Sequence, residues 1–174
     1  MRSIYKIVVC SLLTLSITSC EKDLLEKEQY QKEIYLIGAY NRVWTTEVSY
    51  SNEEVKTYFT VSSSGTLALD RDVNVKMKIN EELVDIYNKK YWTVLNEDKY
   101  YKSLDTDLYS IPSLENTVIK HAEGISAEVP VLIKTASLKI DQSYVIPVEI
   151  ESTTGYPISE SGYKMLILLK LKND

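Results

Sequence analysis

Acidic side chains are the first groups in this sequence whose types and spacing could do chemistry. Asp70, Asp72 and Asn74, followed at a longer interval by Glu81, have the spacing of oxygen ligands in a calcium-binding loop. Such a loop needs glycine at its sixth position, and this chain has Val75 there. The alternation of apolar and polar residues around Val75 favours a half-buried strand instead. We therefore expect no metal site in this segment.

Two common hydrolase sites are also poorly supported by the sequence. A glycosidase needs two carboxyl groups about 5–10 Å apart, one with a raised pKa. Adjacent or near-adjacent acids occur in predicted turns and at a predicted helix start, where solvated carboxylates are expected: Glu53/Glu54, Glu81/Glu82 and Asp105/Asp107. A Ser-His-Asp triad would have to use His121, the single histidine, without any Gly-x-Ser-x-Gly elbow. We therefore expect a protein that is not an enzyme and carries no cofactor.

Aromatic residues that follow a short predicted helix are better candidates for function. Tyr91, Trp92, Tyr100 and Tyr101 lie in one short stretch with polar neighbours. Aromatic faces stack on sugar rings, and nearby polar groups can bond sugar hydroxyls. We predict these four as ligand-binding residues. The alternative is that tyrosine is the preferred core and edge residue of a chain with 14 Tyr and 1 Phe.

The elements that must position these residues are mostly strands. A chain of 174 residues, 44% hydrophobic and 26% charged, has material for one globular domain. Asn80 is a predicted N-cap, and apolar residues at helical spacing predict one short helix over 81–90. Pro147 predicts an edge strand or a bulge, because proline cannot donate to a ladder. Strands are predicted at 33–40 (with Gly38 as a bulge), 43–50, 57–61, 73–79, 116–120, 127–134, 143–150 and 163–171. Such short strands, separated by turn signals, predict an all-β antiparallel sandwich of about seven to eight strands.

The N-terminus has the pattern of a bacterial lipoprotein signal peptide. Arg2 and Lys6 precede an apolar run at 7–17 that is too short for a membrane anchor. The run ends in small residues before Cys20, which resembles a lipobox. We predict a signal peptide at 1–19, lipidation of Cys20, a tether over 20–32 and a folded domain over 33–174. An ordinary secretory signal with an incidental cysteine is the alternative.

Charge and cysteine content limit the partners. The full chain has a formal net charge of −5, and removal of residues 1–19 takes away Arg2 and Lys6 but no acid. An acidic domain is not expected to bind nucleic acid through its phosphates. Cys10 would leave with the signal and Cys20 would carry lipid, so the mature domain has no disulfide. The predicted membrane contact is therefore the lipid.

Several segments resemble the N-terminal immunoglobulin-like domain of unknown function of Bacteroidetes surface lipoproteins in glycan-utilisation systems. They are residues 83–88 (LVDIYN), 95–101 (LNEDKYY), 118–124 (VIKHAEG), 127–131 (AEVPV) and 138–150 (LKIDQSYVIPVEI). His121 and a long 102–115 segment depart from the family pattern. The resemblance covers about residues 33–172 and implies an immunoglobulin-like sandwich.

The resemblance also implies an outer-membrane, surface-exposed location in the cell envelope, and it implies no catalytic activity. The charged run after Cys20 resembles the surface-export signal of these lipoproteins, and a plain linker facing the periplasm is the alternative. We expect a non-catalytic accessory or glycan-binding component of polysaccharide acquisition. The alternative is a structural or adhesin-like module that contacts a partner surface protein through its sheet edges.

Overall fold

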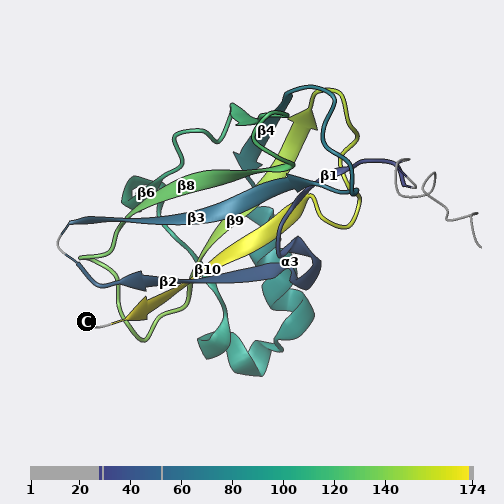
Figure 1. The fold of residues 1–174 in the computed structure, drawn as a ribbon. Helices are drawn as coiled ribbons and strands as arrows, with labels where there is room; N and C mark the ends of the chain where they lie inside the picture. The colour runs from purple at the N-terminus through teal and green to yellow at the C-terminus, as the bar shows by residue number, and fades with distance from the viewer. Residues whose placement is uncertain (1–27, 29, 52, 173–174) are drawn as a thin grey trace, which may run out of the picture. The chain divides into compact units, whose positions relative to one another are not determined.

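The computed structural model describes residues 28, 30–51 and 53–172 (Figure 1). Two units are distinguished, Met1–Tyr30 and Gln31–Asp174, and the fold given below is that of the second unit. The predicted signal peptide at 1–19, Cys20 and most of the tether at 20–32 lie outside the described residues. In the described part of the chain, no helix is long and apolar enough to cross a bilayer.

The second unit is built mainly from strands. Its described residues form ten strands, one α-helix and three short 3-10 helices. In chain order these are β1 (Ile34–Leu36), η1 (Ala39–Asn41), β2 (Val43–Ser49), β3 (Glu54–Ser63), β4 (Val73–Ile79), α3 (Glu82–Tyr91), η2 (Val94–Lys99), β5 (Lys102–Ser103), η3 (Thr106–Leu108), β6 (Tyr109–Ser110), β7 (Thr117–Ile119), β8 (Ser126–Lys134), β9 (Tyr144–Thr153) and β10 (Lys164–Lys172).

The strands form two sheets. One has four strands in the order β1-β3-β8-β6, and the other has six, with β2-β10-β9-β4-β7 in order and β5 beside β9. The core lies between them, where Phe59 and Ile133 of the first sheet belong to the same buried cluster as Val75, Ile146 and Ile167 of the second. Burial of an aromatic or branched side chain contributes roughly 1.5–3 kcal/mol each. The predicted alternation of β4 is confirmed, because its apolar residues are buried and its polar residues are exposed.

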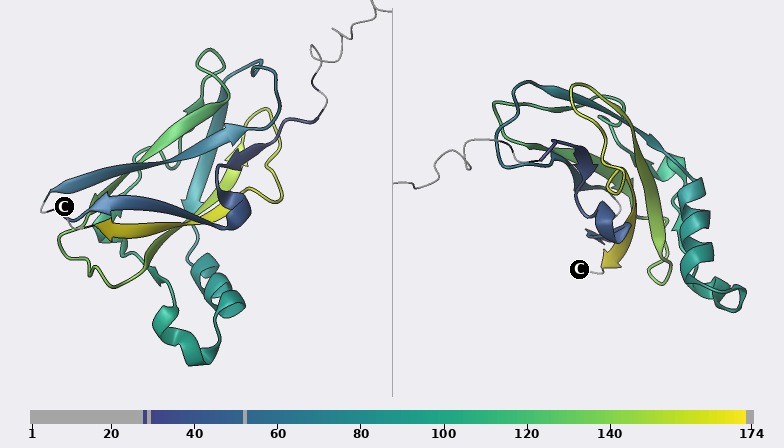
Figure 2. Two further views of the ribbon diagram at one scale, coloured as in Figure 1. Left: turned by 60° about the horizontal axis from the view of Figure 1, so that its bottom comes forward. Right: turned by 90° about the vertical axis from the view of Figure 1, so that its right-hand side faces the viewer.

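Helix α3 covers the outer face of the six-stranded sheet (Figure 2, right). Leu83 and Val84 of α3 form a second buried cluster with Val145 of β9 and Leu166 of β10. Because β9 and β10 are covered on both faces, their sequences are nearly continuous apolar runs rather than alternating ones. The first turn of the helix therefore attaches it to the sheet, through Leu83 and Val84.

The prediction of a wholly antiparallel sheet is wrong at two places. β2 pairs with β10 in parallel from Val43–Leu166 to Ser49–Lys172, and β5 pairs with β9 in parallel. The strand number is ten rather than seven to eight, because β5 and β6 have only two residues each. Parallel partners are joined by long connections, so the turn signals that indicate hairpins carry no information about them.

Predicted boundaries also change, most clearly at the first strand and at the helix. The first strand ends at Leu36 instead of residue 40, and Gly38, with φ of 87°, begins η1 rather than forming a bulge. The helix runs from Glu82 to Tyr91, one residue later than predicted. Asn80 still supports its start, because the Asn80 Oδ1 accepts a hydrogen bond from the Glu82 N–H at 3.2 Å.

Candidate functional site

A cavity of about 280 Å³ opens between α3, η1 and the start of β10. Its wall combines tyrosine rings, aliphatic groups and charged groups. The lining residues include Tyr40, Arg42, Ile86, Tyr87, Glu160, Tyr163 and Lys164. Tyr40 is 89% exposed and Ile86 is 53% exposed, so apolar surface is open to a ligand here. A concave site with apolar walls and few polar groups is the usual form of a small-ligand site.

A tight reversal of the chain places Tyr40 and Arg42 at the cavity. A side chain at Gly38 would put its Cβ 2.5 Å from the Trp44 ring, and its φ is positive, so this position requires glycine. The Arg42 N–H donates to the Ala39 carbonyl oxygen at 2.8 Å. The Arg42 carbonyl oxygen accepts a hydrogen bond from the Leu166 N–H at 2.8 Å. The reversal is therefore fixed to β10, which forms another wall of the cavity.

The opposite wall comes from α3. Ile86 and Tyr87 lie three and four residues after Leu83, which anchors the helix, so they share its side of the helix. The rings of Tyr87 and Tyr101 stack with centroids 5.3 Å apart and planes 14° apart. Burial, followed by the neighbouring Tyr101, raises the pKa of Tyr87.

Asn88 joins the segment after the helix to the helix itself. Its side chain is 4% exposed and makes two hydrogen bonds with the backbone of Tyr101. The Asn88 Nδ2 donates to the Tyr101 carbonyl oxygen at 2.9 Å, and the Tyr101 N–H donates to the Asn88 Oδ1 at 3.0 Å. This pair holds the Tyr101 ring against Tyr87, so Asn88 supports one wall of the cavity.

None of the four aromatic residues predicted from the sequence lines the cavity. Tyr91 and Tyr101 contact Tyr87, which does line it, with the Tyr91 and Tyr87 centroids 4.5 Å apart. Trp92 is half-buried, and its buried indole N–H has no hydrogen-bond partner among the described residues. The Lys99 Nζ lies 5.7 Å from the Trp92 ring centroid, and Tyr100 is half-buried. Ligand contact by these four residues stays a prediction.

Sequence reasoning missed the lining residues on η1 and β10. Tyr40 and Arg42 were included in or beside a predicted strand, and Lys164 in another, so nothing placed them near the helix. One signal was available in the sequence, because glycine inside a predicted strand, as at Gly38, suggests an irregularity of the backbone. The face of α3 that contains Tyr87 was a second signal, since its apolar stripe continues beyond what the sheet covers.

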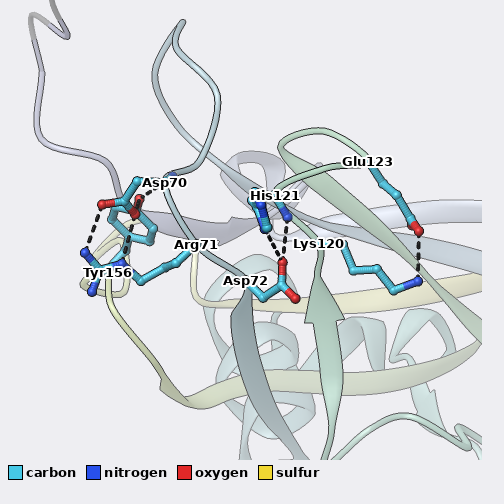
Figure 3. Close-up of polar contacts among 7 residues, drawn as sticks. All are labelled: Asp70, Arg71, Asp72, Lys120, His121, Glu123 and Tyr156. Carbon is cyan, nitrogen blue, oxygen red and sulfur yellow. Dashed lines mark hydrogen bonds and ion pairs between the residues drawn. The ribbon is translucent and has the colours of Figure 1, made fainter.

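The acids considered for calcium binding are engaged in contacts between loops (Figure 3). The Arg71 guanidinium donates two hydrogen bonds of 2.9 Å to Asp70, and the Tyr156 hydroxyl donates a third. These hydrogen bonds hold the pKa of Asp70 well below its usual range, and the contact with Arg71 has the largest effect. Asp72 accepts from the His121 N–H at 3.0 Å and lies 2.6 Å from its Nδ1.

The arrangement of these acids differs from a calcium loop. β4 is an extended strand that separates Asp72, before its first residue, from Glu81, beyond its last residue. At roughly 3.3 Å per residue, the ends of this strand lie far beyond the reach of one ion. The contacts of Asp70 and Asp72 instead connect the segment before β4 to the turns that follow β7 and β9 (Figure 3). This group of residues therefore links loops from different parts of the chain.

Two packed sheets, a helix on one outer face and a tyrosine-lined cavity beside that helix define a β-domain with a candidate ligand site. Residues 30–157 match a protein family described as "-like, N-terminal domain". The chain belongs to this family of N-terminal domains. The resemblance inferred from the sequence to an N-terminal domain of Bacteroidetes proteins is thereby confirmed. No protein with a curated description matches the chain in sequence.

Solved structures with this fold come from Bacteroides. A protein of unknown function from Bacteroides ovatus has a TM-score of 0.64 at 17% identity, covering 83% of this chain and 47% of that one. A candidate carbohydrate-binding protein from the same species has a TM-score of 0.61 at 18% identity, covering 79% and 36%. EndoBT-3987 from Bacteroides thetaiotaomicron, solved with a Man5GlcNAc product, has a TM-score of 0.56 at 20% identity, covering 79% and 30%. The chain thus spans less than half the length of each.

Proposed function

We propose that this protein is a non-catalytic, glycan-binding accessory component of the cell envelope, with the cavity beside α3 as its glycan site. One observation carries the proposal: the rings of Tyr40, Tyr87 and Tyr163 line the same cavity as charged groups that have no ion pair among the described residues. The similar structures support a glycan as the ligand, because they include a candidate carbohydrate-binding protein and a protein solved with a glycan product.

The cavity fits the size and chemistry of a sugar. Ligand sites for small molecules are about 300–1,000 Å³, and the cavity of about 280 Å³ lies close to the lower end of this range. The apolar face of a sugar stacks on a tyrosine ring, and its hydroxyls need donors and acceptors at the rim. Tyr40 supplies an open ring, while Arg42 and Glu160 supply a donor and an acceptor.

A single copy of this domain is expected to bind a glycan weakly. Many copies anchored on one surface are expected to hold a polysaccharide more strongly. A shallow site that contacts one or two sugars gives affinities toward the millimolar end of the scale. Anchoring through lipid on Cys20, at the outer membrane and facing outward, would raise the effective concentration against a repeating polysaccharide. The family and the lipobox-like sequence support this location.

The proposal of a role without catalysis rests on the carboxylates. Among the described residues that line the cavity, Glu160 alone is an acid. Glycoside hydrolysis needs a second carboxyl group about 5–10 Å away across the bound sugar. The two packed sheets also support the immunoglobulin-like sandwich that the resemblance implies, which is a scaffold for binding loops.

The test is affinity electrophoresis through gels that contain plant, fungal and host polysaccharides. We expect the unmodified domain to be retarded by at least one of them. Tyr40→Ala should lose this retardation with an unchanged melting temperature, because the Tyr40 side chain is open to solvent. Tyr58→Ala is the matched control: Tyr58 is a 43% exposed tyrosine on β3 and does not line the cavity.

Two results would contradict the proposal in different ways. Retention of binding by Tyr40→Ala and loss by Tyr58→Ala would place the glycan on the other sheet. Normal mobility of the unmodified domain in every gel would refute glycan binding and leave contact with a partner surface protein as the function.

A further inference from the structure

Arg42 is a cation at the cavity that has no side-chain partner among the described residues. Its guanidinium makes no hydrogen bond or ion pair with any residue in the described part of the chain, although it lines the cavity. Arg71, the other arginine among the described residues, is held by two hydrogen bonds to Asp70 (Figure 3). The difference matters because an unpaired guanidinium retains all five of its N–H donors for a ligand.

The cavity has an excess of positive charge on an acidic protein. Arg42 and Lys164 supply two cations and Glu160 supplies one anion. The Lys164 Nζ lies 4.8 Å from the centroid of the Tyr163 ring, so its contact is with an aromatic face rather than with a carboxylate. The chain as a whole has a formal net charge of −5. A local positive site of this kind attracts anions that the remaining surface repels.

The backbone conformation at Arg42 would suit glycine better than arginine. Arg42 has φ of 64° and ψ of −19°, and it is the non-glycine residue with positive φ among the described residues. Glycine adopts this conformation without strain, whereas a residue with a Cβ does not. Both hydrogen bonds that fix the reversal use backbone atoms of Arg42, so glycine would keep them. Strained residues of this kind cluster at ligand sites.

We propose that the cavity binds an acidic glycan, with the carboxylate or sulfate group of one sugar held by Arg42; this rests on the proposed glycan-binding function. A guanidinium holds a carboxylate or a sulfate through two parallel hydrogen bonds, which fixes the orientation of the sugar. Lys164 adds positive charge beside it. Tyr40 and Tyr87 supply ring surfaces for the sugar itself.

The experiment uses pairs of polysaccharides that differ in charge and share a backbone. Polygalacturonate is compared with fully methyl-esterified pectin, and dextran sulfate with dextran, by gel retardation and titration calorimetry. We expect an acidic member to bind and its neutral partner to bind at least tenfold more weakly. The pectin pair reports on carboxylates and the dextran pair on sulfates. Binding should weaken between 50 mM and 500 mM NaCl, because an exposed ion pair is screened over about 10 Å at 0.1 M salt.

Arg42→Gly is the decisive variant, because its expected effects on stability and on glycan affinity differ. The melting temperature should stay the same or rise as the strain is relieved, while affinity for the acidic glycan falls about tenfold or more, as for loss of a hydrogen bond to a charged group. Arg42→Lys should retain part of the affinity. Arg71→Ala, which removes an arginine outside the cavity, should bind normally.

The outcomes separate this inference from the proposed function. If neutral and acidic members of both pairs bind equally, or if Arg42→Gly binds the acidic member normally, the acidic-glycan assignment is wrong and glycan binding stands. If no polysaccharide of either pair or of the wider panel is retarded, both are wrong.

Discussion

Asn88→Ala should destabilise the domain and loosen one wall of the cavity. The substitution removes the two hydrogen bonds, of 2.9 and 3.0 Å, between the Asn88 side chain and the backbone of Tyr101. Asn88 is only 4% exposed. Each neutral hydrogen bond contributes about 1 kcal/mol, and a buried group left without a partner costs more. Alanine recovers roughly 0.5 kcal/mol, because it is the better helix former. The expected net loss in the free energy of unfolding is about 1.5–2.5 kcal/mol.

Urea unfolding followed by tryptophan fluorescence measures this loss. Trp92 lies between Asn88 and η2 in the chain, so its emission should also shift to longer wavelength if the segment up to Tyr101 moves away from the helix. The stacked contact between Tyr87 and Tyr101 should weaken at the same time. Any glycan affinity measured for the unmodified domain should therefore fall in Asn88→Ala, although Asn88 does not line the cavity.

Asn96→Ala is the matched control. The Asn96 side chain donates to the Thr93 hydroxyl three residues earlier, a local contact at an exposed turn. Its loss should cost less than about 0.5 kcal/mol, as for most surface substitutions. Equal effects of the two substitutions would refute the argument that Asn88 anchors the segment. A loss below about 0.5 kcal/mol in Asn88→Ala would mean that water replaces both hydrogen bonds.

Three further predictions concern other parts of the chain. Gly38→Ala should lower the free energy of unfolding by about 2 kcal/mol or more in a denaturant titration, because the positive φ and the contact with the Trp44 ring both oppose a Cβ; an unchanged midpoint would contradict this. The pKa of Asp70 is depressed on folding from its ordinary 3.8, so its stabilising contribution is present above about pH 4 and is lost as the pH falls further. Asp70→Asn should therefore be less stable at neutral pH and lose less stability on acidification, and a parallel acid limb would count against the contact. Cys20→Ser should release a folded domain from the membrane fraction, and unchanged detergent-phase partitioning would refute lipid anchoring.

The strands were predictable where local periodicity decides the structure. β4 is buried on one face only, so its alternation was clear from the sequence. β9 was predicted as a strand, but Pro147 indicated an edge position or a bulge, whereas β9 lies between β10 and β4. Pro147 is tolerated there because β4 ends at Ile79, opposite Val148, so the ladder with β4 needs no N–H from the proline. The Pro147 carbonyl oxygen still accepts a hydrogen bond from the Asn80 N–H at 3.1 Å. Where the neighbouring strand ends was not visible in the sequence.

The candidate site was predictable only in part, for a similar reason. Residues near α3 were selected because they are close in sequence and aromatic, and two of them do contact Tyr87. Tyr40 and Arg42 come from a reversal before β2, and they reach the cavity because β2 lies beside β10. That pairing is parallel and joins distant parts of the chain. Local patterns do not encode such a contact.

β10 lies between β2 and β9 in the sheet and follows both of them in the chain. β2 has its ladder with β10 and pairs with no other strand in the described part of the chain. During synthesis, β2 therefore has no strand to pair with until β10 has also been made. Contacts this far apart in sequence slow folding, into the millisecond-to-second range for all-β domains. A nascent or truncated chain that lacks β10 exposes the edges of both β2 and β9, which favours aggregation.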